Sequence, residues 1–164
     1  MFSTQSWDLF RAIRSIRIIR SIFFPSACVF VLDRITKAYA HNLPPGKVVS
    51  ILPNIDFGYF LNPSLFFFPA WRFIPYLALA VLIALAIFLA VRTKIRQLTP
   101  DTWPLIPILL GGASNVFDRF YYNGVIDIIH ITGLATINLA DILIFLGLIA
   151  LVLQNRHNNS AITN

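Results

Sequence analysis

Two aspartates, Asp127 and Asp141, lie fourteen positions apart in a segment that is otherwise almost free of charged residues. The stretch between them contains Gly133 and is short enough to fold back, so the two carboxyl groups can meet. Two carboxyl groups in a low-dielectric site do not both ionise easily, and they come to share one proton. The ionised group can then take a proton from water while the protonated group donates to a carbonyl oxygen, as in aspartic proteases.

Asp141 also has a purely structural interpretation. It follows Asn138 by three positions at the start of an apolar run, and this spacing is close to that of a capping box. The helix dipole further favours an acidic residue in the first helical turn. Asp127 has no equivalent explanation, because His130 is the only basic residue near it in the sequence. Capping therefore explains one of the two carboxyl groups and leaves the other unexplained.

A second polar group lies in "GGASNVFDRF", where Asn115, Asp118 and Arg119 share one helix face at i, i+3 and i+4. The small residues 111–114 before them allow another helix to approach closely. One interpretation is a packing seam followed by an Asp118–Arg119 pair that reaches the membrane interface. The other is a polar cluster that orients further groups, and the sequence favours both equally.

A third polar group is "DRITK", in which Asp33 and Lys37 are four positions apart. On a helix they face the same way, so we interpret them as an intrahelical ion pair. The chain has no histidine or cysteine spacing that suits a metal ion, and no serine–histidine arrangement for nucleophilic catalysis. Its single cysteine, Cys28, lies in an apolar run. We therefore expect neither a metal ion nor another cofactor.

The composition indicates which solvent surrounds these polar residues. Of the 164 residues, 57% are hydrophobic and 12% are charged. A soluble domain of this length has too little interior to bury so much apolar surface. Four apolar segments, 21–40, 70–91, 103–121 and 138–154, approach the roughly 20 residues that a helix needs to cross a bilayer. Because backbone polar groups in lipid must be paired internally, we expect all four segments to be transmembrane helices.

The lysine and arginine residues indicate how the chain is oriented. Basic clusters precede the first segment, separate the second from the third and follow the fourth. With four crossings all three clusters lie on one side, which the positive-inside rule makes cytoplasmic, together with both termini. The net charge of +6 is then explained by topology and anionic headgroups, and it does not indicate a nucleic-acid partner.

We expect three parts in the chain. Residues 1–20 form a basic segment on the cytoplasmic headgroups, residues 21–154 form the four-helix membrane domain, and residues 155–164 form a cytoplasmic tail. A secretory signal peptide is the weaker interpretation of the N-terminus, because charged residues interrupt its apolar run. The extracytoplasmic loop 41–69 has β-branched and aromatic runs that predict short strands. The predicted fold class is an all-α membrane protein with a small β-platform between its first two helices.

Five short motifs occur in an order that resembles the lipoprotein signal peptidase (signal peptidase II) family. They are "LDRITK", "LNPSLFF", "GGASNVFDR", "GVIDIIHI" and "INLAD", and the match spans residues 31–151. Each motif is weak alone, but five in order fit a four-helix topology that rests on separate grounds. The resemblance implies an intramembrane aspartic endopeptidase of the bacterial cytoplasmic membrane. Such an enzyme cleaves diacylglyceryl-modified prolipoproteins just before their lipidated cysteine.

The resemblance also implies roles for individual residues by motif position. Asp127 and Asp141 are the implied catalytic dyad. Three residues are implied to hold the substrate backbone and orient the dyad: Asn115, Arg119 and Asn138. Four more are implied to be supporting polar residues: Asn62, Asp33, Lys37 and Asp118. The implied partners are the prolipoprotein and membrane lipids, and we expect a monomer with its site toward the extracytoplasmic face.

Three positions depart from the family pattern. Ser64 and Ser114 stand where glycine is usual, and Ile142 follows Asp141 where a small polar residue is common. None of these changes removes a carboxyl group of the pair, so we predict cleavage. The alternative is a degenerate relative that binds lipidated signal peptides without cleaving them. A proton or ion carrier ranks third, because its acidic residues would be spread through the bilayer depth.

Overall fold

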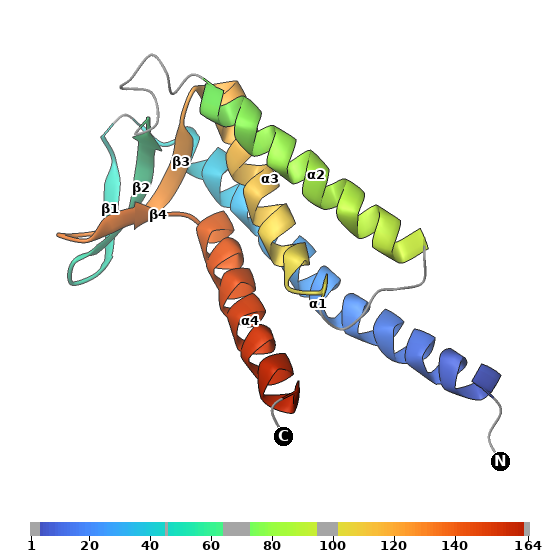
Figure 1. The fold of residues 1–164 in the computed structure, drawn as a ribbon. Coiled ribbons are helices and arrows are strands. Elements are labelled where there is room, and N and C mark those ends of the chain that lie inside the picture. Colours follow the sequence, from blue (N-terminus) through green and yellow to red (C-terminus); the bar gives the residue numbers. More distant parts are fainter. Residues whose placement is uncertain (1–3, 45, 64–72, 95–101, 163–164) are drawn as a thin grey trace.

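A computed structural model of the chain describes residues 4–44, 46–63, 73–94 and 102–162. Figure 1 shows the strands gathered at one end of the helices, with both chain termini at the other end. The helices are α1 (Thr4–His41), α2 (Ile74–Lys94), α3 (Leu105–Tyr122) and α4 (Leu139–Ile162). The strands are β1 (Val48–Leu52), β2 (Ile55–Asn62), β3 (Val125–Ile131) and β4 (Ala135–Ile137).

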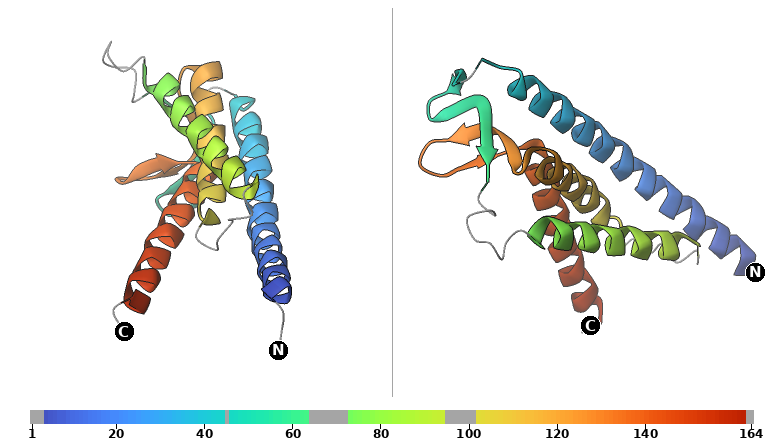
Figure 2. Two further views of the ribbon diagram at one scale, coloured as in Figure 1. Left: turned by 45° about the vertical axis from the view of Figure 1, so that its right-hand side comes forward. Right: turned by 90° about the horizontal axis from the view of Figure 1, so that it is seen from above.

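The four helices follow the four apolar segments of the sequence. Helix α3 contacts each of the other three, and the two views of Figure 2 show it inside the group. By length and apolar composition, one stretch of the described residues could cross a membrane, Leu139–Arg156 in α4. A shorter apolar stretch, Tyr76–Leu89, lies in α2. Helices α1 and α3 contain the charged residues of the second and third polar groups, and their described residues do not meet this criterion of length and apolar composition. Four membrane crossings therefore stay a prediction.

Helix α1 is longer than the sequence predicts. Its 38 residues span about 57 Å at about 1.5 Å per residue, against a hydrocarbon core of about 30 Å. Residues 4–20 continue this helix and do not form an element of their own. The expected contact of the basic segment with cytoplasmic headgroups stays a prediction.

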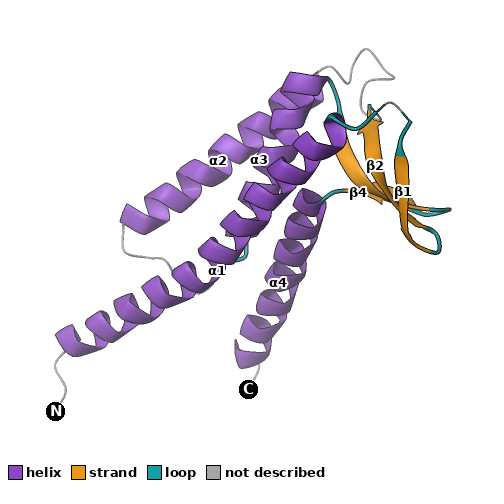
Figure 3. Cartoon of the chain, turned by 180° about the vertical axis from the view of Figure 1, so that it is seen from behind, coloured by secondary structure: helices purple, strands orange, loops and turns teal. Residues whose placement is uncertain are grey.

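The strands form one antiparallel sheet in the order β1-β2-β3-β4. Figure 3 shows it from behind, projecting from the end of the helices. Strands β1 and β2 are the two predicted in the loop 41–69. Strands β3 and β4 are an addition, since the sequence predicts only a short return there. The β-branched run of β3 pairs with β2, with Phe60 opposite Asp127, so the sheet is not confined to the connection between the first two helices.

A small apolar core fixes the sheet to the helices. Ala40 of α1 and Ile126 of β3 are fully buried, and Ile128 is nearly so. Side chains from three other elements pack around them, including Phe57, Tyr59, Tyr122 and Leu139. Alternation along β3 then turns Asp127 to the face opposite Ile126 and Ile128. The sheet therefore carries this aspartate to the ends of α1, α3 and α4.

Gly111 sets the distance between α3 and α4 next to the polar residues. A Cβ atom at this position would lie 2.5 Å from the carbonyl oxygen of Ala140 and 2.9 Å from a side-chain carbon of Ile144. The predicted close approach of small residues is thus seen at Gly111, against the backbone of α4. At Gly112 the nearest atom is the end of the Leu82 side chain, at 2.8 Å.

Gly111→Ala should destabilise the protein by about 1–3 kcal/mol, because backbone cannot move aside as a side-chain end can. Gly112→Ala is the matched control, since Leu82 can change its rotamer. Thermal unfolding of the two variants in detergent measures the difference. A loss for Gly111→Ala no greater than that for Gly112→Ala would contradict this account.

Candidate active site

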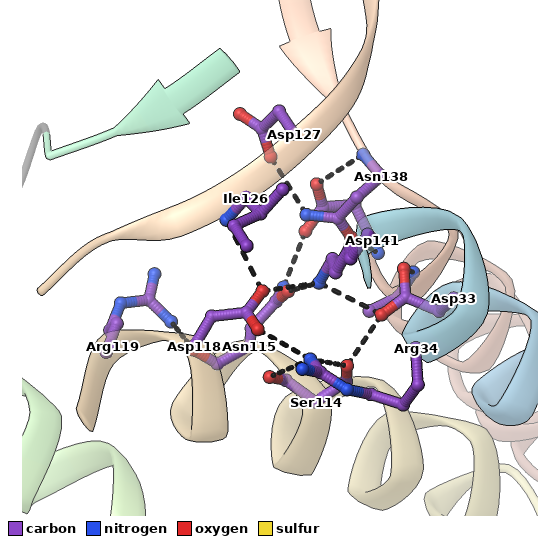
Figure 4. Close-up of polar contacts among 12 residues, drawn as sticks. Asp33, Arg34, Ser114, Asn115, Asp118, Arg119, Ile126, Asp127, Asn138 and Asp141 are labelled. Atoms are coloured by element: carbon purple, nitrogen blue, oxygen red, sulfur yellow. Dashed lines mark hydrogen bonds and ion pairs between the residues drawn. The ribbon is translucent and has the colours of Figure 1, made fainter. Parts of the chain in front are cut away.

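Asp127 and Asp141 are joined through a single residue, Asn138. The side-chain amide of Asn138 donates to Oδ1 of Asp127 at 2.9 Å, and its backbone N–H donates to Oδ2 of Asp141 at 3.2 Å. Figure 4 shows Asn138 between the two carboxyl groups, where β4 leads into α4. Asp127 is 2% exposed and Asn138 is fully buried. The fold therefore brings together the two acidic residues that are fourteen positions apart.

The capping interpretation of Asp141 is confirmed as well. Its backbone N–H donates to Oδ1 of Asn138 at 2.9 Å, while its carboxylate accepts from the N–H of Asn138. These reciprocal bonds form a capping box at the start of α4. Asn138 and Asp141 belong both to the helix cap and to the contact between the two carboxyl groups. The start of α4 therefore fixes where the Asp141 carboxylate lies.

Asn115 holds the other side of Asp141. Its side-chain amide donates to Oδ1 of Asp141 at 2.8 Å, and its side-chain oxygen accepts from Nζ of Lys37 at 3.0 Å. Lysine can only donate, so the oxygen of Asn115 must face Lys37 and its NH₂ group must face Asp141. Lys37 thus orients the amide that contacts the carboxylate.

Lys37 is fully buried and has three acceptors. Besides Asn115, its ammonium contacts Oδ2 of Asp33 at 2.9 Å and Oδ2 of Asp118 at 2.8 Å, and both carboxylates are fully buried. The predicted Asp33–Lys37 pair is confirmed, and it extends to a second helix. Three acceptors match the three N–H groups of the ammonium, which is the condition for burying this charge at tolerable cost.

Asp118 does not form the ion pair with Arg119 that one interpretation of the sequence predicts. It contacts Lys37 and Arg34, both from α1, and its Oδ2 accepts from the backbone N–H of Ile126 at 3.3 Å. Adjacent residues on a helix point about 100° apart, so Asp118 faces α1 while Arg119 points in another direction. The described cluster contains two carboxylates, one ammonium and one guanidinium, and its charges cancel.

Asp33 connects α1 to the first turn of α4. Its Oδ1 accepts from the backbone N–H of Ala140 at 3.0 Å, and its Oδ2 accepts from the hydroxyl of Ser114 at 2.6 Å. Ser114, one of the departures from the family pattern, is fully buried and also accepts from Arg34 at 3.1 Å. The serine at this position therefore links α1 to α3.

The remaining predicted residues lie at the edge of this cluster. Asn62 of β2 donates to Oδ2 of Asp127 at 3.1 Å. Arg119 is half-buried, donates to the carbonyl oxygen of Asn115 at 3.3 Å, and interacts favourably with the charges of Asp141 and Asp127. Ile142 is exposed, and Ser64 lies outside the described residues. The structure thus brings together the nine residues that the sequence assigns to the site.

Three contributors are absent from the sequence-based set. Arg34 and Ser114 complete the cluster around Asp33 and Asp118, and Thr136 donates to Asp127. Ser114 precedes Asp118 by one helical turn, a spacing that indicates a shared face. Thr136 could be found only once β4 is known, because residues two apart share a face in a strand.

The surroundings of Tyr59, on β2, disfavour loss of its proton. Burial raises the pKa of Tyr59 above its usual value, and the nearby Tyr122 and Asp118 raise it further. The ring of His41 lies against both tyrosines, with centroids 5.3 Å and 5.1 Å away. Tyr59 therefore stays neutral at physiological pH.

Among the described residues, no group of three or more His, Cys, Asp or Glu side chains is placed to hold a metal ion.

Comparison with known proteins identifies the family of the chain. The family described as Signal peptidase (SPase) II matches residues 26–156, so the chain belongs to that family. Its members are hydrolases that cleave the signal peptides of lipoproteins. A search of curated protein sequences gave no significant match.

Two solved structures share the fold. Both are described as bacterial membrane enzymes solved by the in meso method, at 2.3 Å and 1.9 Å resolution. The first is 20% identical with a TM-score of 0.69 and covers 90% of each chain. The second is 20% identical with a TM-score of 0.65 and covers 86% of this chain and 91% of the other. At this identity they support the fold alone.

Lys37→Met should cost about 3–5 kcal/mol of stability, because it leaves Asp33 and Asp118 buried without their shared ammonium. The matched control is Lys47→Met, which removes an exposed lysine next to β1. Unfolding by chemical denaturant in detergent compares the two. Equal stability of both variants would show that the buried ammonium is not needed.

Proposed function

We propose that the chain is an intramembrane aspartic endopeptidase with Asp127 and Asp141 as its catalytic dyad. The observation that carries this proposal is the position of Asn138, which bonds both carboxyl groups at once. Family membership supports cleavage of lipoprotein signal peptides. The absence of a competing nucleophile–base arrangement in the sequence supports the aspartic type.

The proposed substrate is a prolipoprotein whose cysteine already carries diacylglycerol, and cleavage falls just before that cysteine. One carboxylate takes a proton from water as the water oxygen bonds to the scissile carbonyl carbon. The other carboxyl group gives its proton to the carbonyl oxygen. Collapse of this intermediate breaks the C–N bond, with a proton passing to the leaving amine. The products are the signal peptide and a lipoprotein with a free amino group on its cysteine.

Several polar residues are placed to serve this reaction. Arg119 has five N–H groups, of which the contact with Asn115 uses one, so its guanidinium can hold a substrate carbonyl. Asn115 and Asn138 orient the dyad, and Asn62 supports Asp127. The cluster of Asp33, Lys37 and Asp118 keeps these residues in place.

The site belongs, in this proposal, at the extracytoplasmic face of the bacterial inner membrane. Both termini lie at the end of the molecule opposite the sheet, which suits an even number of crossings with both termini cytoplasmic (Figure 1). The charge distribution supports the same orientation. The chain is proposed to act as a monomer, in contact with membrane lipids and without a nucleic-acid partner.

Asp127→Asn and Asp141→Asn should each lower kcat by about 100- to 10,000-fold, because each removes one proton-transfer group. The assay uses the purified chain in detergent with a diacylglyceryl lipobox peptide, and mass spectrometry locates the new N-terminus. Asp56→Asn, on the neighbouring strand β2, is the matched control and should retain activity. Full cleavage by either dyad variant would exclude the mechanism. Binding of the peptide by the wild-type chain without cleavage would favour a non-catalytic relative.

A further inference from the structure

Thr136 contacts the Asp127 carboxylate more closely than any other described side chain. Its hydroxyl donates to Oδ2 at 2.7 Å, compared with 3.1 Å for Asn62 on the same oxygen and 2.9 Å for Asn138 on Oδ1. Thr136 comes from β4, two residues before Asn138, and so shares its face. None of the five family-like motifs contains it.

The two carboxyl groups differ in the number of hydrogen bonds that they accept from the described residues. From the described residues, Asp127 accepts three bonds, from Asn62, Thr136 and Asn138. Asp141 accepts two, from Asn115 at 2.8 Å and from the backbone of Asn138 at 3.2 Å. Bonds from donors stabilise the ionised form of a carboxyl group. A short hydroxyl–carboxylate bond is among the stronger of these, because it is charge-assisted.

We propose that Thr136 is a positioning residue that holds Asp127 as the ionised base of the dyad and thereby leaves the proton-donating role to Asp141. This inference rests on the proposed peptidase function. The water loses its proton to Asp127 as its oxygen bonds to the carbonyl carbon. The carbonyl oxygen gains the proton of Asp141, so one proton enters and one leaves the dyad in the same step.

The charged groups on the neighbouring elements do not by themselves make Asp127 the base and Asp141 the proton donor. Arg119 of α3 attracts both carboxylates, so it does not select Asp127 as the base. Lys37 of α1 acts on Asp141 but is neutralised by Asp33 and Asp118. On β2 and β3, Asp56 and His130 face each other across the strands, beyond the dyad. Of the three donors to Asp127, the hydroxyl of Thr136 makes the shortest bond.

The test compares Thr136→Val, which keeps the shape and removes the hydroxyl, with Thr136→Ser, which keeps the hydroxyl. With the diacylglyceryl lipobox peptide, kcat of Thr136→Val should fall about 10- to 100-fold while KM changes less than about twofold. The pH at which activity reaches half its plateau on the acidic side should rise by about one unit. Thr136→Ser should restore both quantities to near wild type. Thr132→Val, in the exposed turn of the same hairpin, should change neither.

Each other result overturns the inference. One is an unchanged kcat and pH profile in Thr136→Val, and another is a lost kcat that serine does not restore. A fall in kcat without movement of the acidic limb would assign Thr136 a structural role only. Thr136→Ala replaces the valine variant if thermal unfolding shows that valine disrupts the hairpin. A wild-type chain that binds the peptide without cleaving it would instead refute the proposed function, and this outcome is seen before any variant is compared.

Discussion

The site depends on one buried ammonium group. Nζ of Lys37 has an acceptor for each of its three N–H groups, and these acceptors come from α1 and α3. Removed from water, such a charge is stable only where the surrounding geometry is complete, so the helices have one mutual arrangement that satisfies it. The same ammonium turns the amide of Asn115 toward Asp141. The need to pair the buried ammonium of Lys37 during folding thus also fixes the orientation of the Asn115 amide in the site.

The first turn of α4 is capped from two sides, by Asn138 just before the helix and by Asp33 of α1. Asn138 accepts from the N–H of Asp141, and Asp33 of α1 accepts from the N–H of Ala140. The N-terminal N–H groups of a helix would otherwise be left unpaired in an apolar environment. Because the capping residue also bonds Asp127, stability of the helix start and geometry of the carboxyl pair cannot vary independently. This coupling explains how a capping residue and a site residue can be the same asparagine.

The sequence predicts the helical segments, the strands β1 and β2, and the meeting of Asp127 with Asp141, because these follow from hydropathy, β-branched runs and motif spacing. It does not predict β3 and β4, since a short β-branched run beside transmembrane segments reads equally well as an apolar return. It also leaves the partner of Asp118 open, because the contact with Arg34 joins residues 84 positions apart. Thr136 carries no signal until its strand pairing is known. Local patterns thus define the elements, and long-range contacts define which polar groups are paired.

The wide separation of Arg34 and Asp118 has a consequence for how the chain is made. During synthesis Asp33 and Lys37 can neutralise each other within their own helix as soon as it forms. Arg34 leaves the ribosome 84 residues before its partner and must wait for it. The charge of Asp33 can therefore be compensated within α1 itself, whereas the charge of Arg34 is compensated by Asp118 only when α3 packs beside α1.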